Sequence, residues 1–193
     1  AVRMLDNVLT ATVWPLPQQA AEAASKRRIG LGFTGLGDAL ILMGLRYDSP
    51  EARAVAAGWA GALRDAAYRA SVALAQEKGA FPLFDLRLLD SGMARRLPEE
   101  IRTEIAAHGL RNSHLLSIAP TGTISLAFAD NASNGIEPAY SWTYTRRKRE
   151  ADGSTRAYPV EDHAWRRWRA RGGNTAELPP AFVNALEIRS EER

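Results

Sequence analysis

The sequence has 193 residues, of which 46% are hydrophobic and 24% charged, so it is long and apolar enough to fold around a core. Without a single cysteine, the chain by itself excludes disulfides, thiolate metal sites and thiol catalysis. The net charge of +3 does not by itself indicate nucleic-acid binding, and no apolar run reaches the roughly 18 residues that a membrane span needs.

The first half of the chain is rich in helix signals. Ser49-Pro50-Glu51 combines an N-cap residue, a proline at the first helical position and an acid in the first turn. Apolar residues then recur every three or four positions up to Gly79, which predicts an amphipathic helix of about 29 residues. Shorter helices are expected over residues 1–13, 18–28, 37–43 and 98–108.

Gly30-Leu-Gly32-Phe-Thr-Gly35 matches the letters of a dinucleotide-binding fingerprint. That fingerprint has to follow a strand, whereas here a predicted helix ends only two residues earlier. The sequence therefore favours a strand or an extended bend whose glycines allow close backbone packing.

The second half carries turns, one strand signal and most of the concentrated basic charge. Asn134-Gly135 predicts a tight turn, a strand is expected from Tyr140 onward, and residues 151–154 predict another turn. A basic amphipathic helix is expected from Val160 to Ala170, and a last short helix from Pro179. The dense basic clusters at 146–149 and 166–171 are interpreted as solvated faces or as contacts to another part of the protein, rather than as a nucleic-acid site.

Residues 117–128 form the stretch with the clearest chemical potential. A short apolar run enters a Pro-Thr-Gly-Thr turn and leaves through a second apolar run, and Thr121, Thr123 and Ser125 place three hydroxyls within five residues. Backbone N–H groups and hydroxyls that converge at such a turn would form an anion cradle. The alternative is a tight turn between two buried segments, which is a common arrangement.

Other candidate groups give no reaction. The three histidines have no metal-ligand spacing, and the serines lack the G-x-S-x-G pattern of a nucleophile elbow. Glu137 is either a buried functional acid or an exposed structural one. The residues alone therefore predict a predominantly helical α/β fold, a single domain over 1–193, with neither a catalytic residue nor a metal site.

Four motifs in the same order nevertheless resemble the large catalytic chain of ribonucleotide reductases, in particular the adenosylcobalamin-dependent class. The resemblance covers about residues 5–168 and leaves 169–193 as a peripheral tail. The motifs are Arg27-Arg28-Ile-Gly-Leu-Gly-Phe-Thr-Gly-Leu-Gly-Asp38, Arg111-Asn112, Ala119-Pro-Thr-Gly-Thr-Ile-Ser125, and Gly135-Ile-Glu-Pro138 with Tyr144-Thr-Arg-Arg147.

The resemblance implies that the chain is the C-terminal part of a ten-stranded α/β barrel. In that family a cysteinyl radical, generated with adenosylcobalamin, reduces ribonucleotides to deoxyribonucleotides. The segment Pro120, Thr121, Gly122, Thr123, Ile124 and Ser125 would hold the phosphates of a ribonucleoside di- or triphosphate.

The radical and redox cysteines of the family are absent from this sequence. The chain is therefore expected to be an inactive fragment that works with the remainder of a cytoplasmic reductase chain and that does not bind cobalamin alone. A homodimer is a further expectation. The alternative is a non-catalytic nucleotide-binding or assembly module with a basic C-terminal docking surface.

Overall fold

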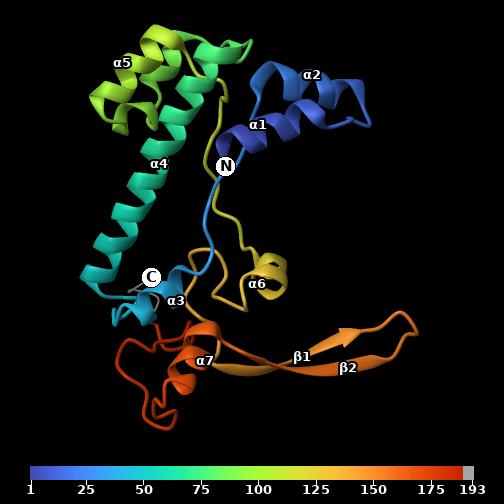
Figure 1. The fold of residues 1–193 in the computed structure, drawn as a ribbon, viewed down its shortest axis with the longest axis vertical. Coiled ribbons are helices and arrows are strands. Elements are labelled where there is room, and N and C mark those ends of the chain that lie inside the picture. The colour runs from blue at the N-terminus through green and yellow to red at the C-terminus, as the bar shows by residue number, and fades with distance from the viewer. Residues whose placement is uncertain (189–193) are drawn as a thin grey trace. The chain divides into compact units, whose positions relative to one another are not determined.

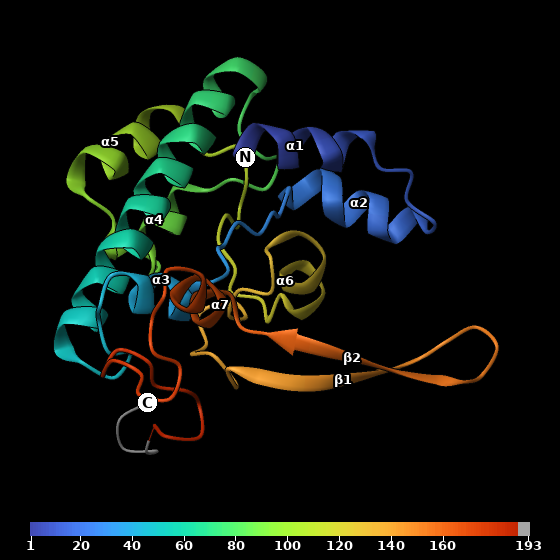
Figure 2. The same ribbon diagram turned by 60° about the horizontal axis from the view of Figure 1, so that its bottom comes forward.

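The computed structural model describes residues 1–188, which separate into two compact units (Figures 1 and 2). Unit 1 contains Ala1–Gly32 and Gly58–Ser117, and unit 2 contains Phe33–Ala57 together with the chain from Ile118 onward. The single domain expected over 1–193 stays a prediction. Within residues 1–188 no helix is both long and apolar enough to cross a membrane.

Unit 1 is built from helices around one apolar core. They are α1 (Val2–Ala11), α2 (Pro17–Lys26), the part of α4 (Pro50–Lys78) from Gly58 onward, the 3-10 helices η1 (Leu86–Asp90) and η2 (Ala94–Arg96), and α5 (Glu99–His108). The side chains of Ile101 and Ile105 on α5 are fully buried against Val72 and Leu74 of α4, and Figure 1 shows these two helices side by side. Burial of the apolar faces stabilises this arrangement.

The long helix α4 confirms the sequence prediction, including its length of 29 residues and both ends. The Ser49 hydroxyl accepts a hydrogen bond from Ala52 N at 3.1 Å, which caps the N-terminus. Gly79 ends the helix with a φ of +82°, a conformation that glycine adopts without strain.

Two extended segments of unit 1 run in parallel, and they confirm the extended conformation predicted for the glycine-rich stretch. Leu31 N donates to Leu115 O at 2.8 Å, and Ser117 N donates to Leu31 O at 3.0 Å. A Cβ atom at Gly32 would collide with Ser117 O, so this close approach requires glycine. The ten-stranded barrel is not formed by residues 1–188, where the named strands are two and antiparallel.

Unit 2 contains α3 (Leu36–Leu42), the beginning of α4, α6 (Gly122–Phe128), β1 (Thr143–Arg149), β2 (Thr155–Glu161) and α7 (His163–Ala170). Strands β1 and β2 pair in antiparallel register from Thr143↔Glu161 to Arg149↔Thr155 and form a ribbon that extends from the α7 region (Figure 2). The strand predicted from Tyr140 begins at Thr143, and β2 was not predicted. β2 carries a proline and an arginine among its apolar residues, which hides the alternating pattern.

The C-terminal part of unit 2 differs from the sequence prediction at two places. Val160 still belongs to β2, so the basic helix begins at His163, where the Asp162 carboxylate accepts from Trp165 N at 3.0 Å. The short helix predicted at Pro179 is wrong, because residues 179–182 form a turn with Phe182 N donating to Pro179 O at 2.9 Å. Phe182 packs against Trp142 and Trp168, with ring centroids 5.3 and 5.8 Å apart. The last part of the predicted tail, 189–193, lies outside the described residues.

Candidate functional site: the turn at residues 120–125

The turn at residues 120–125 has an unusual backbone conformation. Thr121 has φ 56° and ψ 22°, in the left-handed region that a β-branched residue rarely occupies. The first hydrogen bond of α6 runs from Ser125 N to Thr121 O at 2.8 Å. The N–H groups of Gly122, Thr123 and Ile124 therefore have no acceptor inside the helix and are available to a ligand.

The three hydroxyls of this stretch have different surroundings, so they do not converge as the sequence suggested. The Thr123 side chain is exposed to solvent. Ser125 is 1% exposed, and its hydroxyl donates to Ala132 O. The Thr121 hydroxyl lies 2.7 Å from that of Thr34 and accepts from Gly135 N at 2.8 Å. Thr123 therefore offers the only one of the three hydroxyls with no partner within the part of the chain that the structure describes.

The apolar runs on either side of the turn are not buried within this chain. Ile118 is 72% exposed, Ile124 51% and Phe128 86%. Within residues 1–188 the apolar residues around the turn are therefore exposed, and the alternative of a plain turn between two segments buried in the whole protein stays open. Exposed apolar side chains around a polar turn are typical of a surface that meets a ligand or another segment.

A second group of residues supports the turn from within unit 2. Thr34 donates to Ser133 O at 3.0 Å, and Gly135 N lies 3.1 Å from the Thr34 hydroxyl oxygen. Gly135 also approaches the turn closely, since a Cβ atom there would lie 2.5 Å from Ala119 O. The predicted tight turn at 134–135 is present, and its role is to bring the Gly135 N–H to Thr121.

Two buried carboxyl groups, those of Asp38 and Asp162, lie near the Ser133–Gly135 segment. Asp38, on α3, accepts from Ser133 N at 3.0 Å, and Asp38 N donates to the Ser133 hydroxyl at 3.1 Å. The Asp38 carboxyl group also interacts electrostatically with that of Asp162, the N-cap of α7. Because both acids are buried, the pKa of Asp38 is raised, and that of Asp162 is raised to about 8 by burial and by the neighbouring Asp38 charge.

Sequence reasoning missed Thr34, Ser133 and the pairing of Asp38 with Asp162. One signal was available, because Asp38 is the only charged residue in the run from Gly35 to Gly44. A charge inside an apolar run indicates a buried, partnered group. The partners are distant in sequence, and their identity becomes clear only from the folded chain.

The remaining candidates do not form a catalytic site in residues 1–188. His163 Nδ1 pairs with Asp130 at 2.8 Å, and that part of the chain contains no cluster of three or more residues suited to hold a metal ion. Glu137 is exposed and lies at a pocket of about 500 Å³ beside Tyr47 and Tyr140. The Tyr47 hydroxyl donates to Ile136 O at 2.7 Å, and burial followed by the Glu137 charge raises the pKa of Tyr47.

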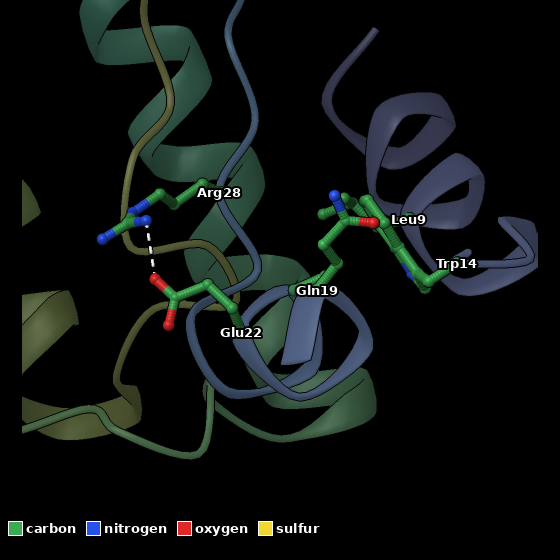
Figure 3. Close-up of a pocket in the computed structure, with 6 residues that line it drawn as sticks. Leu9, Trp14, Gln19, Glu22 and Arg28 are labelled. Atoms are coloured by element: carbon green, nitrogen blue, oxygen red, sulfur yellow. Dashed lines mark hydrogen bonds and ion pairs between the residues drawn. The ribbon is translucent and has the colours of Figure 1, made fainter. Parts of the chain in front are cut away.

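A separate pocket of about 220 Å³ lies in unit 1 between α1 and α2 (Figure 3). Leu9, Ala23 and Trp14 give it apolar walls. Figure 3 shows Gln19 close to Leu9 and Trp14. Its charged members are paired with each other, since Arg28 donates to Glu22 at 2.8 Å. The pocket therefore presents no unpaired charge that would select a ligand.

Comparison with known proteins agrees with the motifs. The family described as "Ribonucleotide reductase, barrel domain" matches residues 1–188. The vitamin B12-dependent ribonucleoside-diphosphate reductase of Mycobacterium tuberculosis is 40% identical over 146 residues, which is 76% of this chain and 19% of that protein. The protein of that name from Thermoplasma acidophilum is 33% identical over 148 residues (76% and 17%), and the ribonucleoside-diphosphate reductase subunit alpha of Treponema pallidum is 32% identical over 156 residues (77% and 18%).

The chain thus spans less than a fifth of the length of these relatives. The family match nevertheless covers nearly the whole chain and includes the turn at residues 120–125, Thr34 and both buried acids. The chain belongs to the ribonucleotide reductase barrel-domain family.

Proposed function

We propose that this chain is the part of a ribonucleotide reductase that holds the phosphate groups of the substrate. The whole protein would reduce ribonucleoside diphosphates to deoxyribonucleotides, because the relatives from M. tuberculosis and T. acidophilum carry the name of a ribonucleoside-diphosphate reductase. The observation that carries the proposal is the turn itself, where three N–H groups and the Thr123 hydroxyl have no hydrogen-bond partner among residues 1–188.

The chemistry of the turn suits a phosphate. The N–H groups of Gly122, Thr123 and Ile124 and the hydroxyl of Thr123 are all hydrogen-bond donors, and donors to an ionised oxygen form the stronger class of hydrogen bond. Gly122 brings no side chain that would fill the space in front of these donors. Pro120 restricts the backbone ahead of the turn and carries no N–H. Of the six residues assigned to the site, Ile124 would contribute through its main chain, and Ser125 would stabilise the turn through Ala132.

The reductive chemistry would come from the rest of the reductase chain. The sequence has no cysteine, so neither a thiyl radical nor a redox dithiol can form on these residues. Cobalamin is likewise assigned to the whole protein. A corrin ring with its amide side chains needs many hydrogen-bonding partners, whereas a pocket of about 550 Å³ in unit 1 and one of about 500 Å³ in unit 2 are lined mainly by apolar side chains. A cytoplasmic location and a homodimer stay predictions.

A titration tests this function. We expect a ribonucleoside diphosphate to shift the amide NMR signals of Gly122, Thr123 and Ile124, and to bind about 10-fold more weakly to Thr123→Val, because a hydrogen bond to a charged group is lost. Thr103→Val is the matched control, since Thr103 is exposed on α5. Absence of binding to the wild-type chain, or equal affinity of the two variants, would contradict the proposal.

The alternative function, an assembly module that docks through its basic C-terminal region, has less support. Arg169 forms two hydrogen bonds to Glu161, at 2.6 and 2.8 Å, and Arg166 pairs with Asp130 at 2.6 Å. Part of the 166–171 cluster is therefore neutralised within the chain. The titration separates the proposed function from that of an assembly module that binds no nucleotide, because such a module predicts no phosphate-dependent shifts at residues 122–124.

A further inference from the structure

We propose that Thr34 is a positioning residue for the phosphate-binding turn, acting through Thr121 and Gly135. This inference rests on the proposed function, because it concerns the geometry of the same site. Thr34 comes from the glycine-rich stretch at residues 30–35, whose match to a dinucleotide fingerprint had no structural support. The inference gives that stretch a role in the site.

The hydrogen bonds around Thr34 allow one consistent arrangement of protons. Ser133 O can only accept, so the single hydroxyl proton of Thr34 goes to Ser133 O at 3.0 Å. The contact of 2.7 Å between the two threonine hydroxyls must then use the proton of Thr121. Gly135 N–H supplies the remaining donor and is shared between the oxygens of Thr121, at 2.8 Å, and Thr34, at 3.1 Å.

This arrangement has a consequence for the ligand. The Thr121 hydroxyl donates its only proton to the Thr34 oxygen, so it cannot also donate to a phosphate oxygen. The donors that face a ligand are then the N–H groups of residues 122–124 and the Thr123 hydroxyl. Thr121 serves the site through its backbone conformation.

That conformation needs support, because a β-branched residue at φ 56° is sterically unfavourable. The two hydrogen bonds of the Thr121 side chain, to Thr34 and from Gly135, hold the residue in this state. Strained backbone of this kind persists where surrounding contacts fix it. Loss of the Thr34 hydroxyl removes one of the two and should release the turn.

The segment that carries Thr34 is itself firmly attached to the 133–135 segment. Gly35 N donates to Ser133 O at 2.8 Å, and Gly35 adopts a φ of +82° that favours glycine. Asp38 adds two further hydrogen bonds to Ser133. These hydrogen bonds hold the backbone on the C-terminal side of Thr34 against the 133–135 segment, so the position of the Thr34 hydroxyl is well defined.

The test compares Thr34→Val, which keeps the shape and loses the hydroxyl, with Thr34→Ser, which keeps the hydroxyl. Inorganic pyrophosphate is the probe, and its affinity is measured from the amide NMR shifts of residues 122–124. We expect binding about 10-fold weaker in Thr34→Val, and affinity within about threefold of wild type in Thr34→Ser. In the absence of ligand, hydrogen exchange at Gly135 N–H should be faster in Thr34→Val alone.

A double-mutant cycle with Thr121→Gly separates positioning from a general loss of stability. Glycine adopts a positive φ readily, so Thr34→Val should weaken pyrophosphate binding much less in the Thr121→Gly background than in the wild type. Equal losses in both backgrounds, or a Thr34→Val chain that binds as tightly as the wild type, would overturn the role of Thr34. If the wild-type chain itself does not bind, the proposed function fails first, and the role of Thr34 fails with it.

Discussion

Buried aspartates occur in both units, and the two units treat them in opposite ways. In unit 1, Asp6 is fully buried and bonds to Arg27 at 2.8 Å and to the Asn112 amide at 3.1 Å. Burial opposes its ionisation, but Arg27 and the charge of Arg111 outweigh burial and lower the pKa of Asp6. In unit 2, Asp38 meets Asp162 instead of a cation, and the pKa of each is raised. Equal burial thus goes with pKa shifts in opposite directions, decided by the charge of the partner.

The comparison of the two aspartates separates motif residues that stabilise the fold from motif residues that lie near the proposed site. Arg27, Arg111 and Asn112 belong to the motifs that carry the family resemblance, and in the structure they surround a structural carboxylate. Asp38 belongs to the same set of motifs, yet it contacts the 133–135 segment that supports the turn at residues 120–125, the proposed phosphate site. A family motif can therefore mark either a folding element or a part of the site.

The largest effect is expected at Asp6. In Asp6→Ala, the Arg27 guanidinium and the Asn112 amide lose the carboxylate that both of them contact, and removal of one member of a buried ion pair costs about 3–5 kcal/mol. The free energy of unfolding, measured by urea titration, should fall by that amount. Amide exchange should accelerate first in residues 1–32 and 58–117.

Glu77→Ala is the control for this variant. Glu77 pairs with Arg3 on the surface of unit 1, where the side chains are 49% and 55% exposed. We expect a change below about 1 kcal/mol, since exposed ion pairs contribute little. An Asp6→Ala chain as stable as Glu77→Ala would show that the buried cluster is not a stabilising element.

The second prediction is that stability changes with pH in opposite directions in the two units. The folded pKa of Asp162 is raised from 3.8 to about 8, so its protonated form stabilises unit 2 fully below pH 3.8, and this contribution is lost as the pH rises toward 8. For one proton the slope approaches about 1.4 kcal/mol per pH unit. Asp6 has a lowered pKa, so its contribution to unit 1 is present above pH 3.8 and is lost below.

Amide hydrogen exchange from pH 4 to pH 8 measures the stability of the two units separately. The rates are corrected for the intrinsic pH dependence of exchange. In Asp38→Asn the new amide can donate to Asp162 at any pH, so the protection of α3 and α7 should become independent of pH and higher than wild type at pH 8. Asp162→Asn should behave similarly, because asparagine also caps helices well. If the wild type shows no loss of protection in α7 between pH 4 and pH 8, the raised pKa of Asp162 is refuted.

Local sequence signals predicted much of the helical part and little of the polar framework. The ends of α4 follow from Ser49, Pro50 and Gly79, which act on their immediate neighbours. The pairing of Thr34 with Thr121 spans 87 positions, and that of Asn112 with Asp6 spans 106. No periodicity encodes such contacts, because they depend on how the chain folds back on itself. The turn at residues 120–125 was found from its residue types, while the division of labour among its hydroxyls required the structure.

A smaller effect is expected at Ser71, which links α4 to the Asp6 cluster. Its buried hydroxyl donates to the Asn112 side-chain oxygen and accepts from Asn112 N, both at 3.1 Å. Ser71→Ala leaves both Asn112 groups without this partner, which should cost about 1–3 kcal/mol. Ser25→Ala, which removes a surface bond within α2, is the control and should change the urea midpoint much less. Equal midpoints would mean that Asn112 finds other partners when Ser71 is replaced.

The smallest effect is expected at Arg28, the direct neighbour of Arg27 in sequence. Arg28 is half exposed and pairs with Glu22 at the edge of the unit 1 pocket (Figure 3). Glu22 keeps Lys26 at 2.6 Å when Arg28 is removed, so Arg28→Ala should change the free energy of unfolding by less than about 1 kcal/mol. Arg27→Ala, measured alongside by urea titration, should lose several times more, since the Arg27 side chain is only 10% exposed and its partner Asp6 is fully buried. Comparable losses at the two positions would show that burial does not set the value of these ion pairs, and the contrast between the buried acids would lose its physical basis.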